Sequence, residues 1–406
     1  MANPAENNVK NESPAQENKM GVMPVGKLLF TMSLPIMISM LVQALYNVVD
    51  SMFVARVSEN ALTALSMAFP IQNLMIAVST GLGVGLNAVL SRALGAKDEK
   101  SVNRAATNGI MLLFICGLVF MLGGATIVRP YFEMQTDIAE IVESGVDYTT
   151  IVMLGSMGIF MQILFERLLQ STGRTLLTMV SQGAGAIANI ILDPIFIFGF
   201  GWGIRGAAIA TVLAQIIALI WQFHILSDKS ELLHFRRGIY RLRRKIVRDI
   251  LAIGMSPFLM NLAACFIVIL INKGLKQYGG DLMIGAYGIV NRLAFFFVMI
   301  VMGINQGMQP IAGYNFGARQ YDRVLRVLRL TVIGATCVTG AGFLMGELAP
   351  RLAVSAFTND PELIRLAVEG MRIVFVCFPI IGFQMVATNF FMSIGMAGKA
   401  IFLSLS

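Results

Sequence analysis

The amino-acid sequence predicts an all-α polytopic membrane protein built from two parallel six-helix repeats. Of its 406 residues, 56% are hydrophobic and only 13% are charged, whereas soluble domains carry roughly 25% charged residues. The mean hydropathy is +0.74. Two further observations support this fold class: uncharged runs of bilayer length recur along the chain, and the second half repeats the first.

Ten uncharged runs long enough to span a bilayer follow one another, and an eleventh begins near Ala400. Two helices, at about 60–92 and 282–314, are longer than a bilayer requires, so we expect them to tilt or protrude. The polar residues 1–26 predict a disordered tail. The ten runs are 28–49, 60–91, 105–128, 148–165, 175–192, 206–227, 251–272, 293–318, 330–346 and 373–398.

Basic residues concentrate in every second connection between these runs. Arg167 and Arg174 fall in the fourth connection, and the sixth, 228–248, is strongly basic. The positive-inside rule then places the N-terminus and the even-numbered connections in the cytoplasm of a multi-pass cell-membrane protein. We interpret 228–248 as a linker between an N-lobe, 27–227, and a C-lobe, 249–406; a nucleic-acid or lipid-headgroup patch is the alternative.

The internal repeat is visible as a constant shift. Pro35 and Pro257 are separated by 257 − 35 = 222 residues, and the same shift aligns further positions without a gap. Each repeat contains an even number of helices, so both halves cross the membrane in the same direction. The shift also predicts that most of an eleventh helix and all of a twelfth fall beyond Ser406. Matched pairs include Gly81/Gly303, Gly85/Gly307, Gly95-Ala96/Gly317-Ala318, Gln162/Gln384 and Gly173/Gly395.

Four polar residues in the first half are candidates for a cation-binding and coupling site. Asp50 follows about 22 uncharged residues, and an ionisable group at that depth is a functional candidate because lipid disfavours it. Asn189 and Asp193 are four apart and share a helix face. At about 1.5 Å per residue, Asp50 lies roughly 33 Å and Asp193 roughly 27 Å along outward-running helices, and Thr211 about 10 Å inside the outer surface.

This placement predicts one site in the outer half of the membrane. Two carboxyl groups in a desolvated site cannot both ionise at low cost, so they suit a carried proton. The same oxygens, with an amide and a hydroxyl, suit Na⁺ equally well. Two structural alternatives remain: the helix has already left the bilayer at Asp50, or each polar residue forms hydrogen bonds only with its own neighbours.

The second half offers amides where the first offers carboxylates. Asn272 occupies the position that corresponds to Asp50. Arg292 either pairs across a cleft or snorkels to the outer surface. We expect a substrate cleft to draw on Gln170, Asn272, Asn291, Arg292, Gln306, Gln309 and Gln384.

As a set, these motifs resemble the multidrug and toxic compound extrusion (MATE) family, and most closely its prokaryotic DinF-like branch. The resemblance rests on 46–50 (Tyr-Asn-Val-Val-Asp), 95–97, 170–174, 189–194 and 317–319, and covers the chain from about residue 24. It implies a V of two lobes that opens outward, with Asp50, Asn189, Asp193 and Thr211 as the N-lobe cation site. It also implies export of cationic amphiphiles in exchange for H⁺ or Na⁺.

Three functions therefore compete. The first is a monomeric secondary antiporter for organic cations, with no cofactor beyond its coupling ion. The second is a flippase for a lipid-linked oligosaccharide, which would require a more cationic cleft than Asp50 and Asp193 provide. The third is an intramembrane hydrolase with paired aspartates, which would need no twofold repeat. A primary pump is disfavoured because the sequence has no Gly-x-x-x-x-Gly-Lys-Ser/Thr loop.

Overall fold

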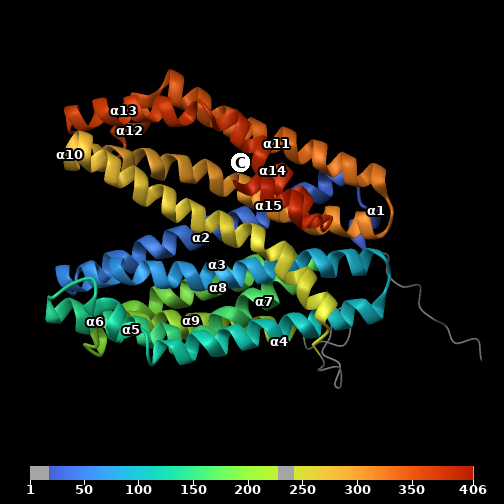
Figure 1. The fold of residues 1–406 in the computed structure, drawn as a ribbon, viewed down its shortest axis with the longest axis horizontal. Coiled ribbons are helices and arrows are strands. Elements are labelled where there is room, and N and C mark those ends of the chain that lie inside the picture. Colours follow the sequence, from blue (N-terminus) through green and yellow to red (C-terminus); the bar gives the residue numbers. More distant parts are fainter. Residues whose placement is uncertain (1–17, 227–241, 406) are drawn as a thin grey trace, which may run out of the picture.

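The computed structural model describes residues 18–226 and 242–405, and this part of the chain is almost entirely helical (Figure 1). Figure 1 shows two layers, an N-lobe of α2–α9 and a C-lobe of α10–α15, which converge near α1 and diverge toward α6 and α12. The elements are α1 (Lys19–Val22), α2 (Val25–Ala55), α3 (Glu59–Gly95), α4 (Glu99–Gly124), α5 (Val128–Glu133), α6 (Ala139–Leu154), α7 (Ser156–Ser171), α8 (Thr175–Pro194), the π-helical η1 (Ile195–Gly199), α9 (Gly203–Leu226), α10 (Arg244–Gly317), α11 (Tyr321–Leu348), α12 (Pro350–Ser355), α13 (Pro361–Phe375), α14 (Phe378–Ser393) and α15 (Ala397–Leu405).

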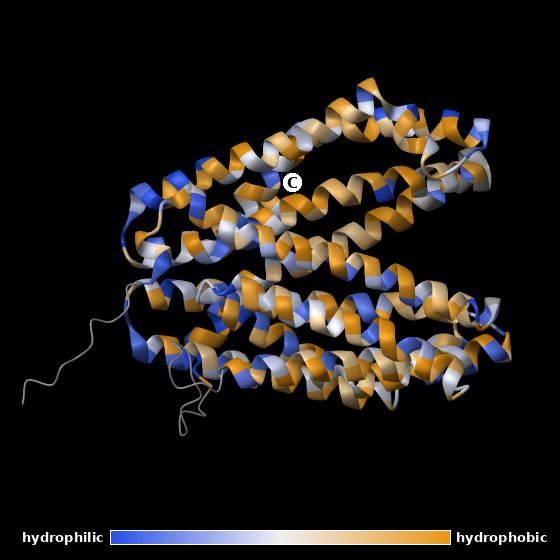
Figure 2. Ribbon diagram, turned by 180° about the vertical axis from the view of Figure 1, so that it is seen from behind, coloured by the Kyte–Doolittle hydropathy of each residue, from blue (hydrophilic) through white to orange (hydrophobic). Residues whose placement is uncertain are grey.

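The protein is a multi-pass membrane protein, as the sequence predicted. Eight helical segments in the described ranges are long and apolar enough to cross a bilayer, or ten if each of two bent pairs forms one span. Helix α10 supplies two of them, Arg244–Leu275 and Leu282–Gly317, and Figure 1 shows the chain folding back between these arms. Large apolar side chains such as Phe69, 62% exposed, are left uncovered by the rest of the protein, and Figure 2 shows hydrophilic residues gathered toward the helix ends.

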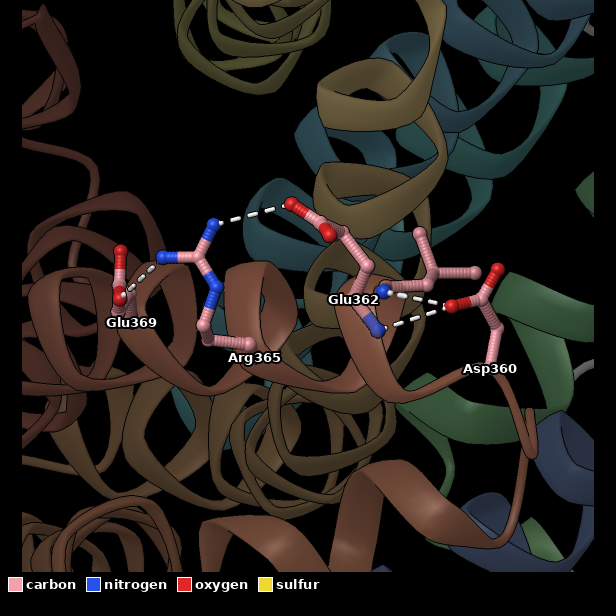
Figure 3. A network of polar contacts seen from close by, with 5 residues as sticks. Asp360, Glu362, Arg365 and Glu369 are labelled. Carbon is pink, nitrogen blue, oxygen red and sulfur yellow. Dashed lines mark hydrogen bonds and ion pairs between the residues drawn. The ribbon is translucent and has the colours of Figure 1, made fainter.

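The bent pairs correct the fourth and tenth predicted runs. The fourth span starts at Ala139 and bends by 46° between α6 and α7; the tenth starts at Pro361, bends by 48° between α13 and α14, and ends at Ser393. The predicted starts were late because an uncharged run cannot include the charged residues in the first turns of a membrane-spanning helix. Figure 3 shows such charges at the start of α13. There Asp360 accepts bonds from two backbone N–H groups, and Arg365 pairs with Glu362 (3.2 Å) and Glu369 (3.3 Å).

The repeat extends to backbone conformations that L-residues rarely adopt. Lys97 has φ +54° and its repeat partner Arg319 has φ +59°. Gly173 and Gly395 have φ +83° and +84° and end α7 and α14. Gly395 therefore explains why the tenth predicted run, drawn to residue 398, stops early: the chain turns there before α15 begins.

The two lobes interlock through the first halves of α2 and α10. Leu28 and Met32 of α2 are buried in an apolar cluster with residues of α10, α11 and α14. Reciprocally, Ile250 of α10 belongs to the N-lobe cluster. The expected boundary between lobes at 227 thus divides the sequence but not the hydrophobic cores.

Small residues allow this close approach. A Cβ on Gly85 would collide with the backbone of Ile250, and one on Gly307 with Ser33. These two glycines are repeat partners, so each half contributes a glycine that closely approaches the first membrane-spanning helix of the other half. Backbones that touch at glycine are a common device for packing helices in lipid.

Several charged or terminal residues lie elsewhere than expected. Residues 18–26, predicted to be part of a disordered tail, include helix α1, whose Met20 is fully buried. Arg167, which the sequence placed in a connection, lies within α7, and Arg92 lies in the last turn of α3. The reason is that each makes buried contacts that compensate for the loss of water. The part of the 228–248 linker that precedes residue 242 lies outside the described residues.

Candidate functional site

Three helices of the N-lobe bring the four candidate cation-site residues to one place. Asp50 lies near the end of α2, Asn189 and Asp193 near the end of α8, and Thr211 two turns into α9. The Asn189 Nδ2 donates to Asp193 Oδ1 at 3.2 Å and lies 3.5 Å from the Thr211 Oγ1. Asp50 and Asp193 interact electrostatically, so the two carboxyl groups share one environment.

Three members of this cluster are buried, but not all of their polar atoms have hydrogen-bond partners. Asp50 is 8% exposed, Asn189 2% and Asp193 0%. One oxygen of each (Asp50 Oδ1, Asn189 Oδ1 and Asp193 Oδ2) is buried without a hydrogen-bond partner among the described residues. Buried hydrogen-bond acceptors are normally paired. Three unpaired acceptors in one cluster therefore suit a proton or a small hard cation, because hard cations prefer oxygen ligands.

The chain that follows Asp193 holds the cluster in shape. Pro194 has no N–H to donate, and the helix widens directly after it into η1, where Phe200 N–H bonds to the Ile195 carbonyl at 2.9 Å. Trp202 then stacks on Phe196, with ring centroids 5.5 Å apart. This turn places the start of α9, and with it Thr211, against the end of α8. A π-helical turn of this kind is common beside functional residues.

A second buried polar network, which the sequence did not reveal, lies inside α7. The Glu166 carboxylate accepts from Gln170 Nε2 (2.9 Å) and Gln182 Nε2 (2.8 Å). Arg167 Nη1 donates to Gln170 Oε1 (2.8 Å) within the N-lobe and to Gln306 Oε1 (3.0 Å) of the C-lobe. Glu166 and Arg167 are only 7% and 5% exposed, so two buried charged side chains of α7 belong to a network that the Arg167–Gln306 bond extends across the interface between lobes.

One sequence signal could have located this network. Gly173 marks the end of the helix, so Glu166 and Arg167 lie well before that end and not in the fourth connection. The structure therefore corrects the prediction for Arg167, which lies in α7. Arg174 lies in the turn before α8, in a connection as predicted.

The expected cleft residues have different environments in the structure. Gln170 and Gln306 share the network of Arg167, while Gln309, 1% exposed, donates to the Val84 carbonyl of the N-lobe at 3.2 Å. Gln384 donates to the Leu403 carbonyl of α15. The other members are Asn291 and Arg292, which are exposed, and Asn272, whose side chain lies outside the described part of the chain.

Metal-ligating side chains do not cluster elsewhere in the described ranges. No group of three or more His, Cys, Asp or Glu residues could hold a metal ion there. The four cysteines (Cys116, Cys265, Cys337 and Cys377) are free.

Comparison with known proteins agrees with this architecture. A family model described as MatE matches residues 35–195 and 254–406. The chain is 26% identical over 389 residues to the "Multidrug export protein MepA" of Staphylococcus haemolyticus (strain JCSC1435), covering 94% of this chain and 84% of that protein. It is 26% identical over 359 residues to the protein of the same name from Staphylococcus aureus (strain MSSA476), covering 86% and 77%.

Solved structures share the fold. "Crystal structure of MATE in complex with MaL6" superposes with a TM-score of 0.89 at 23% identity, over 96% of this chain and 88% of that chain. "Outward-facing conformation of a multidrug resistance MATE family transporter of the MOP superfamily" gives 0.88 at 23% identity, over 96% and 87%. With its two repeated lobes and the family model matching most of both, this chain belongs to the MatE family of multidrug and toxic compound extrusion transporters.

Proposed function

We propose that this protein exports amphiphilic organic cations across the cell membrane in exchange for H⁺ or Na⁺, and that the ion binds at Asp50 and Asp193. The observation that carries the proposal is the group of three buried, unpaired oxygens of Asp50, Asn189 and Asp193. The name "multidrug export protein" of the staphylococcal relatives supports the substrate class.

Two carboxyl groups in a dry pocket give such an exchange a physical basis. Their mutual repulsion and their desolvation are both relieved when a cation or proton enters. Binding therefore favours the state of the lobe in which the site is filled, and a ligand shifts a conformational equilibrium only by such differential affinity. Asn189 and Thr211 would orient the carboxylates and supply neutral oxygens to the ion.

The location of the site supports coupling to movements of the lobes. Asp50 lies on α2, whose first half packs in the C-lobe core and whose later residues reach the N-lobe site. The proposed sequence is that ion entry from the divergent end alters the packing of α2 against α8. Because α2 contacts both lobes, that change would be transmitted to their interface.

The test is uptake of a fluorescent organic cation, ethidium, into everted membrane vesicles carrying the full chain, because uptake into everted vesicles corresponds to export from the cytoplasm. A pH gradient and a Na⁺ gradient are imposed separately, so the arm that drives export identifies the ion. Asp50→Asn and Asp193→Asn keep the side-chain shape but remove the charge, and each should lower gradient-driven export at least about tenfold. The double variant should be no worse than either single one, because residues that act as a unit are not additive.

Asp137→Asn is the matched control, because Asp137 is exposed at the same end of the molecule. It should export at the wild-type rate. Wild-type export by Asp50→Asn under either gradient would show that the coupling ion binds elsewhere.

A further inference from the structure

Helix α1 lies at the convergent end of the molecule and contacts both lobes (Figure 1). On the C-lobe side, Met20 is fully buried in an apolar cluster with Met308 and Ile311 of α10. On the N-lobe side, the turn between α7 and α8 packs against α1. A Cβ on Gly173 of that turn would lie 2.9 Å from the Lys19 Cε and 3.5 Å from the Met20 Cγ. One short segment therefore joins the two lobes where they converge.

Hydrogen bonds hold α1 to the C-lobe. Asn315 Nδ2 donates to the Met20 carbonyl at 3.0 Å. Arg323 Nη2 donates to the Met20 carbonyl at 3.0 Å and to the Met23 carbonyl at 2.7 Å. Arg323 Nε also donates to Asn315 Oδ1 at 2.9 Å, so the two side chains orient each other. A cation bonded to the last carbonyls of a helix stabilises that end, and α1 is therefore anchored on the C-lobe.

This anchor is absent from the corresponding positions of the first half. The 222-residue shift pairs Asn315 with 315 − 222 = 93 and Arg323 with 323 − 222 = 101, which are Ala93 and Ser101. The first half thus has neither an amide nor a cation where the second half holds α1. The two side chains therefore serve α1 and not the architecture that the halves share.

The contact of α1 with the N-lobe is weaker than its anchor. Carbon atoms of Lys19 and Met20 pack against Gly173 there. Burial lowers the pKa of the Lys19 ammonium, and the nearby Arg174 guanidinium lowers that pKa further. Like charges repel, so this pair opposes the contact between α1 and the turn. We therefore expect α1 to part from the N-lobe before it parts from the C-lobe.

We propose that α1 is a clasp: it stays anchored on the C-lobe, closes the convergent end, and releases the α7–α8 turn when the lobes part there. Transporters with repeated lobes expose a central site alternately to the two sides by moving one lobe against the other. Figure 1 shows the lobes apart at one end and together at the end where α1 lies. Opening of that end separates α1 from Gly173, so the strength of their contact sets how often it opens. This role concerns lobe movement alone and holds whichever ion is carried.

Opening of the convergent end can be measured at Ser91 of α3. This residue is fully buried against the C-lobe, since a Cβ on Gly313 of α10 would lie 3.1 Å from its Cβ. Ser91→Cys, in a full chain without the four native cysteines, should react with a maleimide only when the lobes part. The chain is held in lipid nanodiscs, which expose both faces, and the labelling rate is followed by mass spectrometry. No ion gradient is needed, so the result does not depend on the proposed cation site.

Two substitutions should change the labelling rate of Ser91→Cys in opposite directions. Arg323→Gln removes the guanidinium that anchors α1 and should speed labelling at least about fivefold, because hydrogen bonds from charged groups are strong. Lys19→Glu replaces repulsion from Arg174 by attraction and should slow labelling at least about threefold. A segment that served only to fill space would not give opposite signs.

Matched variants control for charge and for folding. Lys27→Glu makes the same charge change at an exposed residue of α2, and Arg329→Gln removes an exposed arginine of α11. Both should label within about twofold of the unsubstituted chain, as surface changes usually have small effects. Lys100→Cys, exposed at the same end, should react equally fast in every variant. Thermal unfolding identifies a variant that does not fold, and Lys19→Glu then decides the outcome if Arg323→Gln is lost.

Either of two results would overturn the proposal. The first is labelling of Ser91→Cys in the Lys19→Glu chain as fast as in the Lys27→Glu chain, or faster. The second is labelling in a folded Arg323→Gln chain no faster than in the Arg329→Gln chain. Slower labelling with Lys19→Glu together with faster labelling with Arg323→Gln would establish α1 as the clasp.

Discussion

At the scale of single residues, the molecule depends on a few backbone positions as much as on its buried charges. Gly173 turns the chain between α7 and α8 with φ +83°. A Cβ there would lie 2.9 Å from the Lys19 Cε, and 3.5 Å from the Met20 Cγ of α1. The left-handed conformation favours glycine, whereas the flexible Lys19 side chain could shift to relieve its contact with a Cβ.

Gly173→Ala should therefore destabilise the protein by about 1–2 kcal/mol, because left-handed backbone is costly for alanine. The measurement is the midpoint of thermal unfolding in detergent. The control is Gly183→Ala in α8, where a Cβ would meet nothing within 4 Å. That substitution should leave the midpoint unchanged or slightly higher, since alanine favours helix over glycine. Equal shifts for the two variants would contradict the assignment.

At the scale of helices, the repeat places a proline at the same point of α2 and α10. Neither Pro35 nor Pro257 can donate a backbone hydrogen bond. Ser39 Oγ donates to the Pro35 carbonyl at 2.9 Å, and Asn261 Nδ2 to the Pro257 carbonyl at 2.8 Å. At both sites, the side chain four residues after the proline donates a hydrogen bond to the proline carbonyl. Because both helices contact both lobes, we expect them to bend at these prolines and the prolines to act as hinges.

Pro35→Ala restores the missing N–H and should raise the unfolding free energy by at most about 3 kcal/mol. Ethidium export should slow at the same time, because a straighter α2 moves less readily between packing arrangements. Pro361→Ala is the control, since the first turn of α13 has no use for that N–H. Export at the wild-type rate, or straight helices at both prolines in a crystal structure, would remove the hinge role.

At the scale of the whole molecule, charge sets the direction in the membrane. Figure 1 shows the turn between α3 and α4 at the convergent end and the segment between α5 and α6 at the divergent end. The first turn and its flanks carry Arg92, Lys97 and Lys100, and the second segment and its flank carry Asp137 and Glu140. Because basic connections remain in the cytoplasm, we expect the convergent end to be cytoplasmic and the lobes to diverge outward.

A membrane-impermeant thiol reagent tests this orientation. Lys100→Cys should be labelled only in everted vesicles, and Asp137→Cys only in right-side-out ones. Both should label after permeabilisation, which controls for reactivity. Labelling of both from one side would refute the topology. The background must lack the native thiols of Cys116, Cys265, Cys337 and Cys377.

Much of this architecture could be predicted from the sequence, since the properties involved are local. Apolar run length located the spans, although the fourth and tenth begin earlier than predicted. The 222-residue shift pairs Lys97 with Arg319, and both residues have a positive φ in the structure. The isolation of Asp50 in an apolar helix and the four-residue spacing of Asn189 and Asp193 were enough to group the candidate cation site. Hydrophobicity and helical periodicity need no knowledge of distant neighbours.

Tertiary structure alone decided which charges are buried and which helices are shared. Glu166 and Arg167 ended an uncharged run in the sequence, yet they lie inside α7, where amides of α7, α8 and α10 form hydrogen bonds with them. In the same way, α2 begins in the C-lobe core although it precedes the whole N-lobe in the chain. A buried charge, or a helix that packs in the core of the other lobe, depends on partners far away in sequence. Those partners stabilise it only once the two lobes have packed together.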